Sequence, residues 1–128
     1  MFKVISSAEE MPSLDSLIQE INEKAQGKIG LVFSYTGIVR EYSRNGTKVK
    51  GVRIKVDRDK LAEIIEEAQK LPGIFEVRAF VREGELKVGD YVMRLVGAGD
   101  FRDNVINSLT NVLNQIKESV TYKEEIPA

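Results

Sequence analysis

Two hydrophobic periods alternate along this chain, and their order restricts the possible folds more than any single motif does. Three segments, beginning near Ser13, Leu61 and Asp103, carry apolar residues at the i, i+3, i+4 and i+7 spacing of an amphipathic helix. Between them lie shorter apolar segments with the alternation or the continuous runs typical of strands, around residues 29–35, 49–56, 75–81 and 91–96. With a further strand expected before the first helix, the order βα-ββ-α-ββ-α predicts an α+β fold with an antiparallel sheet and three main helices.

Local signals predict where these elements end. Gly27 and the pair Pro72-Gly73 stop the first two helices, and Asp103 is the predicted N-cap of the third. Asn45-Gly46 predicts a type I′ hairpin, because both residues tolerate the positive φ that this turn demands.

The remaining segments carry weaker signals. Gly51 predicts a β-bulge, because the apolar phase shifts by one residue around it. Residues 82–90 are predicted to be a turn-rich connection bracketed by Gly84 and Gly89. The tail after Ser119 has no period, so no element is predicted there.

Length and composition limit both architecture and chemistry. With 128 residues, 42% of them hydrophobic, the chain is predicted to form one domain over residues 1–128 that buries a core without metal or disulfide. It has no Cys and no His, which excludes thiolate nucleophiles, Cys/His zinc sites and imidazole catalysis. An enzyme of this composition must use Lys, Arg, Tyr, Ser, Thr or carboxylates. No metal or cofactor is predicted.

The N-terminus lacks the apolar region of a signal peptide and no apolar run is long enough to span a membrane, so we expect a cytoplasmic protein without a membrane partner.

Basic residues are concentrated between Arg40 and Arg58, where seven Lys or Arg side chains accompany only two acidic ones, although the whole chain has a net charge of −1. Two interpretations remain open: this segment binds an anionic ligand, or it is the solvated outer face of a strand pair. Nucleic-acid binding is not predicted, because no aromatic residue is interleaved with the charges between Arg44 and Arg58.

The last predicted helix carries further candidates at both ends. Lys117 ends it and Lys123 follows six residues later beside Tyr122. Two ammonium groups in one pocket can serve as nucleophile or acid–base catalyst, although a lysine in a last helical turn also simply complements the helix dipole. Arg102 precedes the same helix, where a cation is unfavourable unless an anion joins it. The glycine pair Gly97 and Gly99 lacks the rest of a nucleotide-binding fingerprint.

Three ordered blocks together resemble a known family. Residues 33–40 (FSYTGIVR) are similar to its strand motif Phe/Tyr-Thr-Gly-x-Val-Arg, and residues 82–90 (REGELKVGD) to its His-Arg-x-Gly-x-Leu-x-x-Gly-Asp/Glu. The third block is the last helix with Arg102 before it, Lys117 at its end and Tyr122-Lys123-Glu124 beyond. The set resembles the large, catalytic subunit of molybdopterin synthase, a molybdenum cofactor biosynthesis protein of E type, from about Gly27 to Glu125.

The resemblance implies an α/β-hammerhead-like fold, a homodimer, and a heterotetramer with a small ubiquitin-like sulfur-carrier subunit that ends in Gly-Gly. The implied reaction converts cyclic pyranopterin monophosphate, or precursor Z, into molybdopterin with two sulfurs from the carrier's thiocarboxylate. A subunit without Cys agrees with sulfur arriving on a partner. By position, Lys117 and Lys123 are the implied catalytic lysines, and the implied substrate-binding residues are Tyr35, Arg40 and Arg102.

Two departures from the family pattern keep an alternative open. Asp100-Phe101-Arg102 stands where the family usually has Ala-His-Arg, and the tail around Lys123 lacks the usual Pro and Trp and is one residue shorter. The alternative function is a non-enzymatic module of the same fold that binds a ubiquitin-like sulfur carrier. Retention of the two lysines, the two arginines and Tyr35 favours the enzyme.

Overall fold

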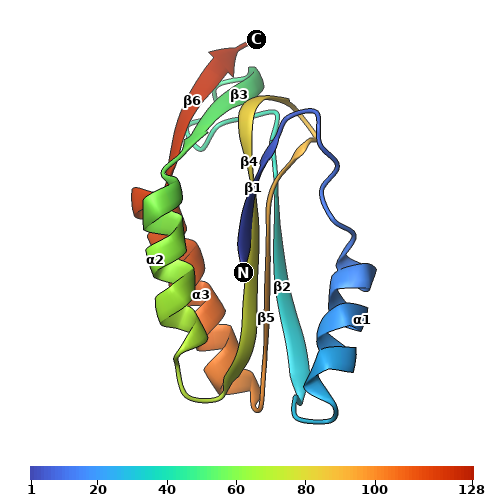
Figure 1. Ribbon diagram of the computed structural model, residues 1–128. Coiled ribbons are helices and arrows are strands. Elements are labelled where there is room, and N and C mark those ends of the chain that lie inside the picture. The colour runs from blue at the N-terminus through green and yellow to red at the C-terminus, as the bar shows by residue number, and fades with distance from the viewer.

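A six-stranded sheet with helices on both faces forms the centre of the computed structural model, which describes all 128 residues (Figure 1). The predicted α+β fold with three main helices is confirmed. In chain order the elements are β1 (Phe2–Ser6), α1 (Leu14–Ala25), β2 (Leu31–Ile38), β3 (Val49–Val56), α2 (Arg58–Gln69), β4 (Ile74–Lys87), β5 (Tyr91–Gly99), α3 (Arg102–Ser119) and β6 (Thr121–Pro127).

The strand order in the sheet is β2-β5-β4-β3-β6, and every neighbouring pair along it is antiparallel, as predicted. β1 lies off this path and pairs with β4 in parallel. β2 and β6 end this path, and β1 has β4 as its single partner, so each of these three strands has one side of its backbone without a strand partner.

β4 connects two parts of the sheet, because its 14 residues pair first with β5 and then with β3. The change of partner falls at Gly84, whose φ of +114° is open to glycine but not to other residues without strain. The predicted turn-rich connection over residues 82–90 is therefore wrong over most of its length. The strand continues to Lys87, and only the three residues before Tyr91 form the turn.

Helices α2 and α3 cover one face of the sheet and α1 covers the other (Figure 1). The larger core lies beneath α2 and α3 and includes Leu61, Leu95 and Ile116, which are fully buried. Ser13 and Asp57 cap α1 and α2 by accepting backbone hydrogen bonds from Ser16 and Lys60.

The predicted cap of α3 is wrong. Asp103 lies inside the first helical turn, where its charge suits the helix dipole, and the N-cap position belongs to Phe101, which makes no capping hydrogen bond through its side chain.

The predicted hairpin at Asn45-Gly46 is also wrong, because β2 and β3 do not pair with each other. A single bridge between Tyr42 and Lys48 closes the 39–48 loop, and only Gly46 has a positive φ. The Asn45 side chain instead accepts a hydrogen bond from the backbone of Thr47. The predicted irregularity at Gly51 is confirmed by a shift of register between β3 and β6 at that point.

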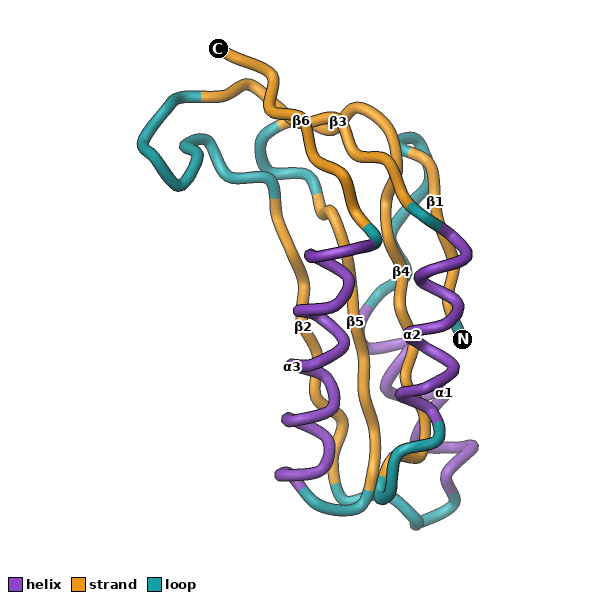
Figure 2. The backbone as a smooth tube through the Cα atoms, turned by 90° about the vertical axis from the view of Figure 1, so that its left-hand side faces the viewer, coloured by secondary structure: helices purple, strands orange, loops and turns teal.

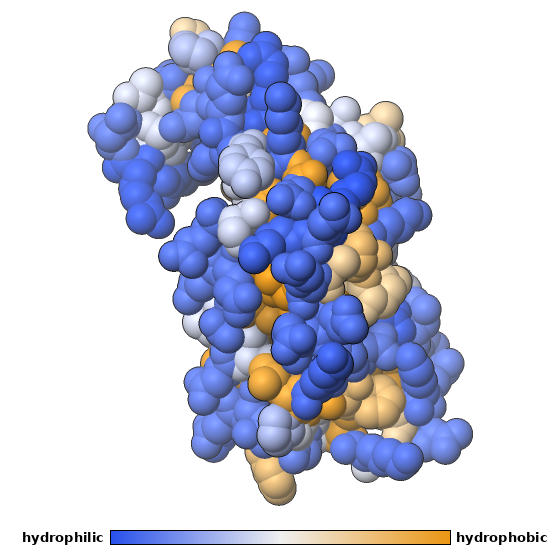
Figure 3. All heavy atoms as spheres, turned by 60° about the vertical axis from the view of Figure 1, so that its left-hand side comes forward, coloured by the Kyte–Doolittle hydropathy of each residue, from blue (hydrophilic) through white to orange (hydrophobic).

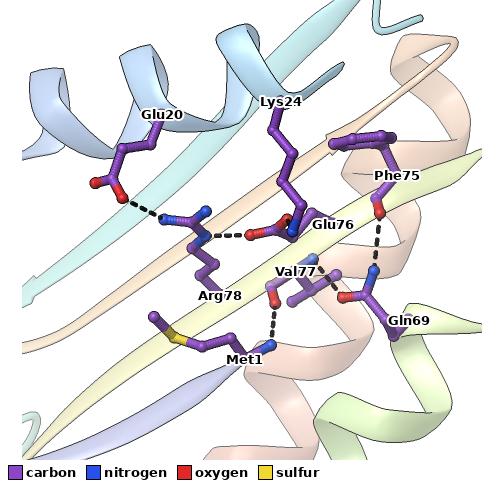
Figure 4. Close-up of polar contacts among 8 residues, drawn as sticks. All are labelled: Met1, Glu20, Lys24, Gln69, Phe75, Glu76, Val77 and Arg78. Carbon is purple, nitrogen blue, oxygen red and sulfur yellow. Dashed lines mark hydrogen bonds and ion pairs between the residues drawn. The ribbon is translucent and has the colours of Figure 1, made fainter. Parts of the chain in front are cut away.

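A charged cluster lies between α1 and the sheet (Figure 4). We call Glu20, Lys24, Glu76 and Arg78 the Glu76 cluster. The Glu76 carboxylate accepts a 2.8 Å hydrogen bond from the Lys24 Nζ atom and a second hydrogen bond from Arg78, whose guanidinium also lies 3.6 Å from Glu20. Burial alone would raise the pKa of Glu76, but the hydrogen bonds and charges of Lys24 and Arg78 outweigh it and hold this pKa below its usual value.

Candidate active site at the end of helix α3

A cleft of about 700 Å³ opens on the face that α2 and α3 cover, beyond the C-terminal end of α3. Buried apolar side chains of β3 and β5, among them Val52, Ile54 and Met93, line it. The 39–48 loop extends past the sheet edge beside β2 (Figure 2). Figure 3 shows the recess as a notch between the upper lobe of the molecule and its body. Four of the five predicted site residues line this cleft, namely Tyr35, Arg40, Lys117 and Lys123.

Lys117 reaches the cleft from the last turn of α3. Its Nζ atom lies 5.6 Å from the centroid of the Tyr35 ring, a separation at which a cation is attracted to the face of an aromatic ring. Tyr35 stands in β2, which packs beside α3 (Figure 2). This contact between two elements fixes where the lysine ammonium sits at the cleft.

Lys123 reaches the cleft from β6, an element that the sequence analysis did not predict. β6 pairs with β3, and in this register Lys123 lies opposite Ile54 and Thr121 opposite Val56. Because side chains alternate along a strand, Thr121, Lys123 and Glu125 share the face that lines the cleft, while Tyr122 points away and is exposed. The strand pairing, rather than the sequence separation of six residues, brings Lys123 to the same cleft as Lys117.

Arg40 lies two residues after the end of β2 and lines the cleft. Its Nε atom donates a 2.7 Å hydrogen bond to the carbonyl oxygen of Tyr42, while its two terminal nitrogens make no hydrogen bond within the chain. Arg44, in the 39–48 loop, lines the same cleft. Two guanidinium groups therefore line one cleft, and guanidinium is the side-chain group best suited to bidentate hydrogen bonds with phosphate.

The other five members of the basic segment lie outside the cleft lining. Lys48 pairs with Glu41 and Arg58 with Glu83, and Arg53 lies between Glu85 and Glu124. Both interpretations of this segment thus hold for different residues: part of it forms a solvated, ion-paired face, and Arg40 and Arg44 line the cleft.

The cations of the cleft have no acidic partner within the chain. Arg40, Arg44, Lys117 and Lys123 form no ion pair, whereas eight basic residues elsewhere in the molecule do. Glu125 is the single carboxylate that lines the cleft. The cleft therefore has a local excess of positive charge, and an anionic ligand of small-molecule size fits it.

Arg102 is not brought together with these residues. It stands at the first position of α3, fifteen residues before Lys117, which corresponds to about 22 Å along a helix. A separate shallow pocket with Gly30, Leu31 and Asp100 surrounds it. Hydrogen bonds from the Asn104 side chain and the Phe101 backbone hold the pKa of Asp100 below its usual value. Within one chain, Arg102 cannot contact a ligand that Lys117 contacts.

Three residues of the cleft were missed as site candidates. Arg44 appeared in the sequence only as one of seven basic residues, and its position depends on the conformation of the 39–48 loop. Thr121 and Glu125 were missed together with β6. The alternation of Thr121, Lys123 and Glu125, followed by the buried Ile126, is the signal that could have indicated this strand.

Neither a metal site nor a membrane span is found. No group of three His, Cys, Asp or Glu side chains is arranged to hold a metal ion. None of the helices has both the length and the apolar character that crossing a bilayer requires.

Comparison with known proteins gives one family and a set of related folds. The family model described as MoaE protein matches residues 7–119. An uncharacterized protein of Methanocaldococcus jannaschii is 29% identical over 105 residues, which cover 79% of this chain and 88% of that protein.

Among solved structures, the chain is similar to molybdopterin synthase from Staphylococcus aureus, with a TM-score of 0.79 and 25% identity over 99% of this chain and 91% of that one. A MoaE protein from Burkholderia ambifaria gives a TM-score of 0.76 at 18% identity, covering 98% and 89% of the two chains. A complex of subunits 1 and 2 of molybdopterin-converting factor from Helicobacter pylori gives 0.71 at 19% identity, covering 99% and 89%.

Proposed function

The chain belongs to the MoaE protein family, and from this premise we propose that it is the catalytic subunit of a molybdopterin synthase that transfers sulfur to a pterin phosphate. The observation that carries the proposal is the convergence of Tyr35, Arg40, Lys117 and Lys123 on one cleft. These residues come from β2, the loop after it, α3 and β6. Cations without ion-pair partners serve no evident purpose in packing, whereas an anionic substrate would use all of them.

The roles follow from the chemistry of each group. Arg40, with Arg44 beside it, would hold the phosphate of precursor Z through its free terminal nitrogens. Lys117 and Lys123 would supply or remove protons, or form a transient covalent bond, while the cyclic phosphate opens and carbon–sulfur bonds form. Tyr35 would line the pterin-binding part of the cleft and hold the Lys117 ammonium.

Sulfur must come from another protein, because this chain has no Cys. The Helicobacter pylori relative is a complex of subunits 1 and 2 of molybdopterin-converting factor, which supports a small ubiquitin-like sulfur carrier as the partner here. Its thiocarboxylate sulfur would bond to a carbon of the substrate as a carbon–oxygen bond at that carbon breaks and the oxygen leaves with the opened phosphate or as water. A second water molecule would then cleave the acyl–sulfur bond. The sulfur would remain on the product and the carrier would keep a carboxylate. Two such transfers yield the dithiolene, and the cytoplasm remains the compartment that we propose.

Arg102 requires a second copy of the chain if it binds the same substrate. The homodimer implied by the family provides one, and the free edge of β2 supports a specific arrangement. Arg102 lies beside Gly30 and Leu31 at the start of β2, and Arg40 follows its end. If two β2 edges paired antiparallel about a two-fold axis, Arg102 of each copy would approach the cleft of the other.

Subunit mixing tests this shared site. Lys117→Ala and Arg102→Ala, each inactive alone, should regain activity when refolded together, because half of the sites in a mixed dimer carry neither change. Random mixing predicts about a quarter of wild-type activity. No regain, with mixed dimers demonstrated by mass spectrometry, would remove Arg102 from the shared site.

Reconstitution tests the function itself. The purified chain, mixed with precursor Z and the thiocarboxylated carrier, should produce a dithiolene pterin detectable by fluorescence of its oxidised derivative. A carrier without its C-terminal Gly-Gly should bind much more weakly in calorimetry, because only its tail enters the cleft. Tight binding of the intact carrier without any product would favour the alternative, a non-enzymatic carrier-binding module.

A further inference from the structure

Gly37 lies two residues after Tyr35 on the same face of β2. Its backbone conformation does not explain why a glycine stands at this position. Its φ is not in the left-handed region, so any residue could adopt its backbone conformation. Glycine in a strand also weakens the strand, because it adds no side-chain packing. Something other than backbone conformation must favour a hydrogen atom at this position.

The Tyr35 side chain occupies the space that a larger residue at position 37 would need. A Cβ atom at Gly37 would lie 3.2 Å from the Tyr35 hydroxyl oxygen and 3.3 Å from its Cε1 atom. The aromatic ring therefore leans along the strand over Gly37, toward the end of β2 where Arg40 follows. A methyl group at position 37 would move the ring, because these separations are tighter than ordinary van der Waals contacts.

The same ring contacts the proposed catalytic lysine. The Lys117 Nζ atom lies 5.6 Å from the ring centroid, and no ion pair or hydrogen bond otherwise fixes it. A shift of the ring by a few tenths of an ångström would therefore change the position that the ring gives the Lys117 ammonium at the cleft. Gly37, Tyr35 and Lys117 form a chain of contacts in which the first residue sets the place of the last.

We propose that Gly37 is a positioning residue that acts through the Tyr35 ring on the Lys117 ammonium. The structural part concerns contacts alone, whereas its effect on turnover rests on the function proposed above. A competing explanation exists, because the pairing of β2 with β5 shifts register between Gly37 and Ile38. If glycine served only this shift, changes at position 37 would act independently of Tyr35.

Nuclear magnetic resonance of the complete chain tests the contacts without any activity. The ε-methylene protons of Lys117 should show an upfield ring-current shift, assigned by its disappearance in Lys117→Met. The shift should be lost in Tyr35→Ala and strongly reduced in Gly37→Ala. Ser34→Ala is the matched control: it changes the same strand on the opposite face and should leave the shift intact. An unchanged shift in a folded Gly37→Ala variant would overturn the proposal.

A double-mutant cycle on turnover separates the two explanations. Gly37→Ala should lower kcat by roughly ten- to a hundredfold with little change in the KM for precursor Z, because a misplaced catalytic group loses rate while Arg40 still binds phosphate. In a Tyr35→Ala background the same substitution should have little further effect. Additive effects would show that Gly37 acts through the strand register and overturn the proposal. The two experiments can also disagree. If the variants lose the proton shift but the wild-type protein forms no product, the contacts are confirmed and the proposed function is wrong.

Discussion

The Glu76 cluster and the cleft at the end of α3 differ in the burial of their charged residues and in whether the cations have carboxylate partners. In the cluster every cation has a carboxylate partner, and Glu76 and Arg78 are only 6% and 8% exposed. In the cleft Arg40, Lys117 and Lys123 are exposed and have no carboxylate partner within the chain. Buried charges must be paired or hydrogen-bonded within the fold, whereas exposed cations remain available to bind a ligand. The contrast predicts that the cluster governs stability and the cleft governs activity.

Substitution of Lys117 should give the largest effect and should confine it to activity. Lys117→Ala should lower turnover by about 10²- to 10⁴-fold, the usual contribution of a positioned acid–base group. Lys117→Arg and Lys117→Gln should fail as well, because neither retains a titratable amine. Product formation measures the effect, and urea unfolding should change by no more than about 0.5 kcal/mol. The matched control is Lys55→Ala, an unpaired lysine of β3 outside the cleft lining.

Substitution of Glu76 should give the converse result. Glu76→Gln leaves the buried Arg78 with the single partner Glu20 and should lower the free energy of unfolding by about 3 kcal/mol. Urea denaturation measures this change, and kcat of the protein that remains folded should match the wild type. Loss of turnover at unchanged stability would break the assignment of the cluster to the fold.

The same comparison explains what the sequence could predict. The helices were predictable because their apolar stripes are long, as in α3, where Val105, Leu109 and Val112 are all buried. β6 was not, because it is short and at the edge, and its pairing with β3 is non-local. Gly84 and Gly89 both indicate a turn in the sequence, yet only Gly89 lies in one. Gly84 lies within β4, where its positive φ allows the strand to bend.

The candidate site shows the same limit. Tyr35, Arg40, Lys117 and Lys123 were found through ordered motifs, although only the pairing of β3 with β6 brings Lys123 to the others. The helix predicted between Arg102 and Lys117 already separates these two residues by about 22 Å, so their positions at opposite ends of α3 follow from the sequence, although the motifs had grouped them in one site. Nothing in the spacing indicated the Glu76 cluster, because its members join α1 to β4 across fifty residues.

Arg40 should contribute to binding rather than to rate. Arg40→Ala should weaken binding of precursor Z by about 1.5–3 kcal/mol, the usual effect of removing a charged hydrogen-bonding partner. Arg40→Lys should restore part of the loss, since a point charge replaces a planar fork. Calorimetry measures both, and inorganic phosphate should compete with the substrate in the wild type. Unchanged affinity in Arg40→Ala would show that the phosphate binds elsewhere.

The depressed pKa of Glu76 should make the cluster sensitive to acid. A carboxyl whose pKa is lower in the folded than in the unfolded state stabilises the fold above its unfolded pKa, and this contribution is lost as the pH falls through the folded pKa. Unfolding experiments should therefore show stability falling below about pH 4.5. The fall should be shallower in Glu76→Gln, which has no carboxyl at this position to protonate. Parallel curves for the two proteins would contradict this origin of the acid sensitivity.

The smallest effect should come from charges that are paired but exposed. Arg53 lies between Glu85 and Glu124 at N–O distances of 3.7 and 3.5 Å, yet its side chain is 52% exposed. Solvent screens such pairs, so Arg53→Ala should lower the free energy of unfolding by no more than about 1 kcal/mol, and 1 M salt should remove most of the difference. Turnover should not change, because Arg53 lies outside the cleft lining. A loss as large as that of Glu76→Gln would mean that ion pairs stabilise this fold whether or not they are buried. The Glu76 cluster and the cleft would then differ only in whether their cations have carboxylate partners.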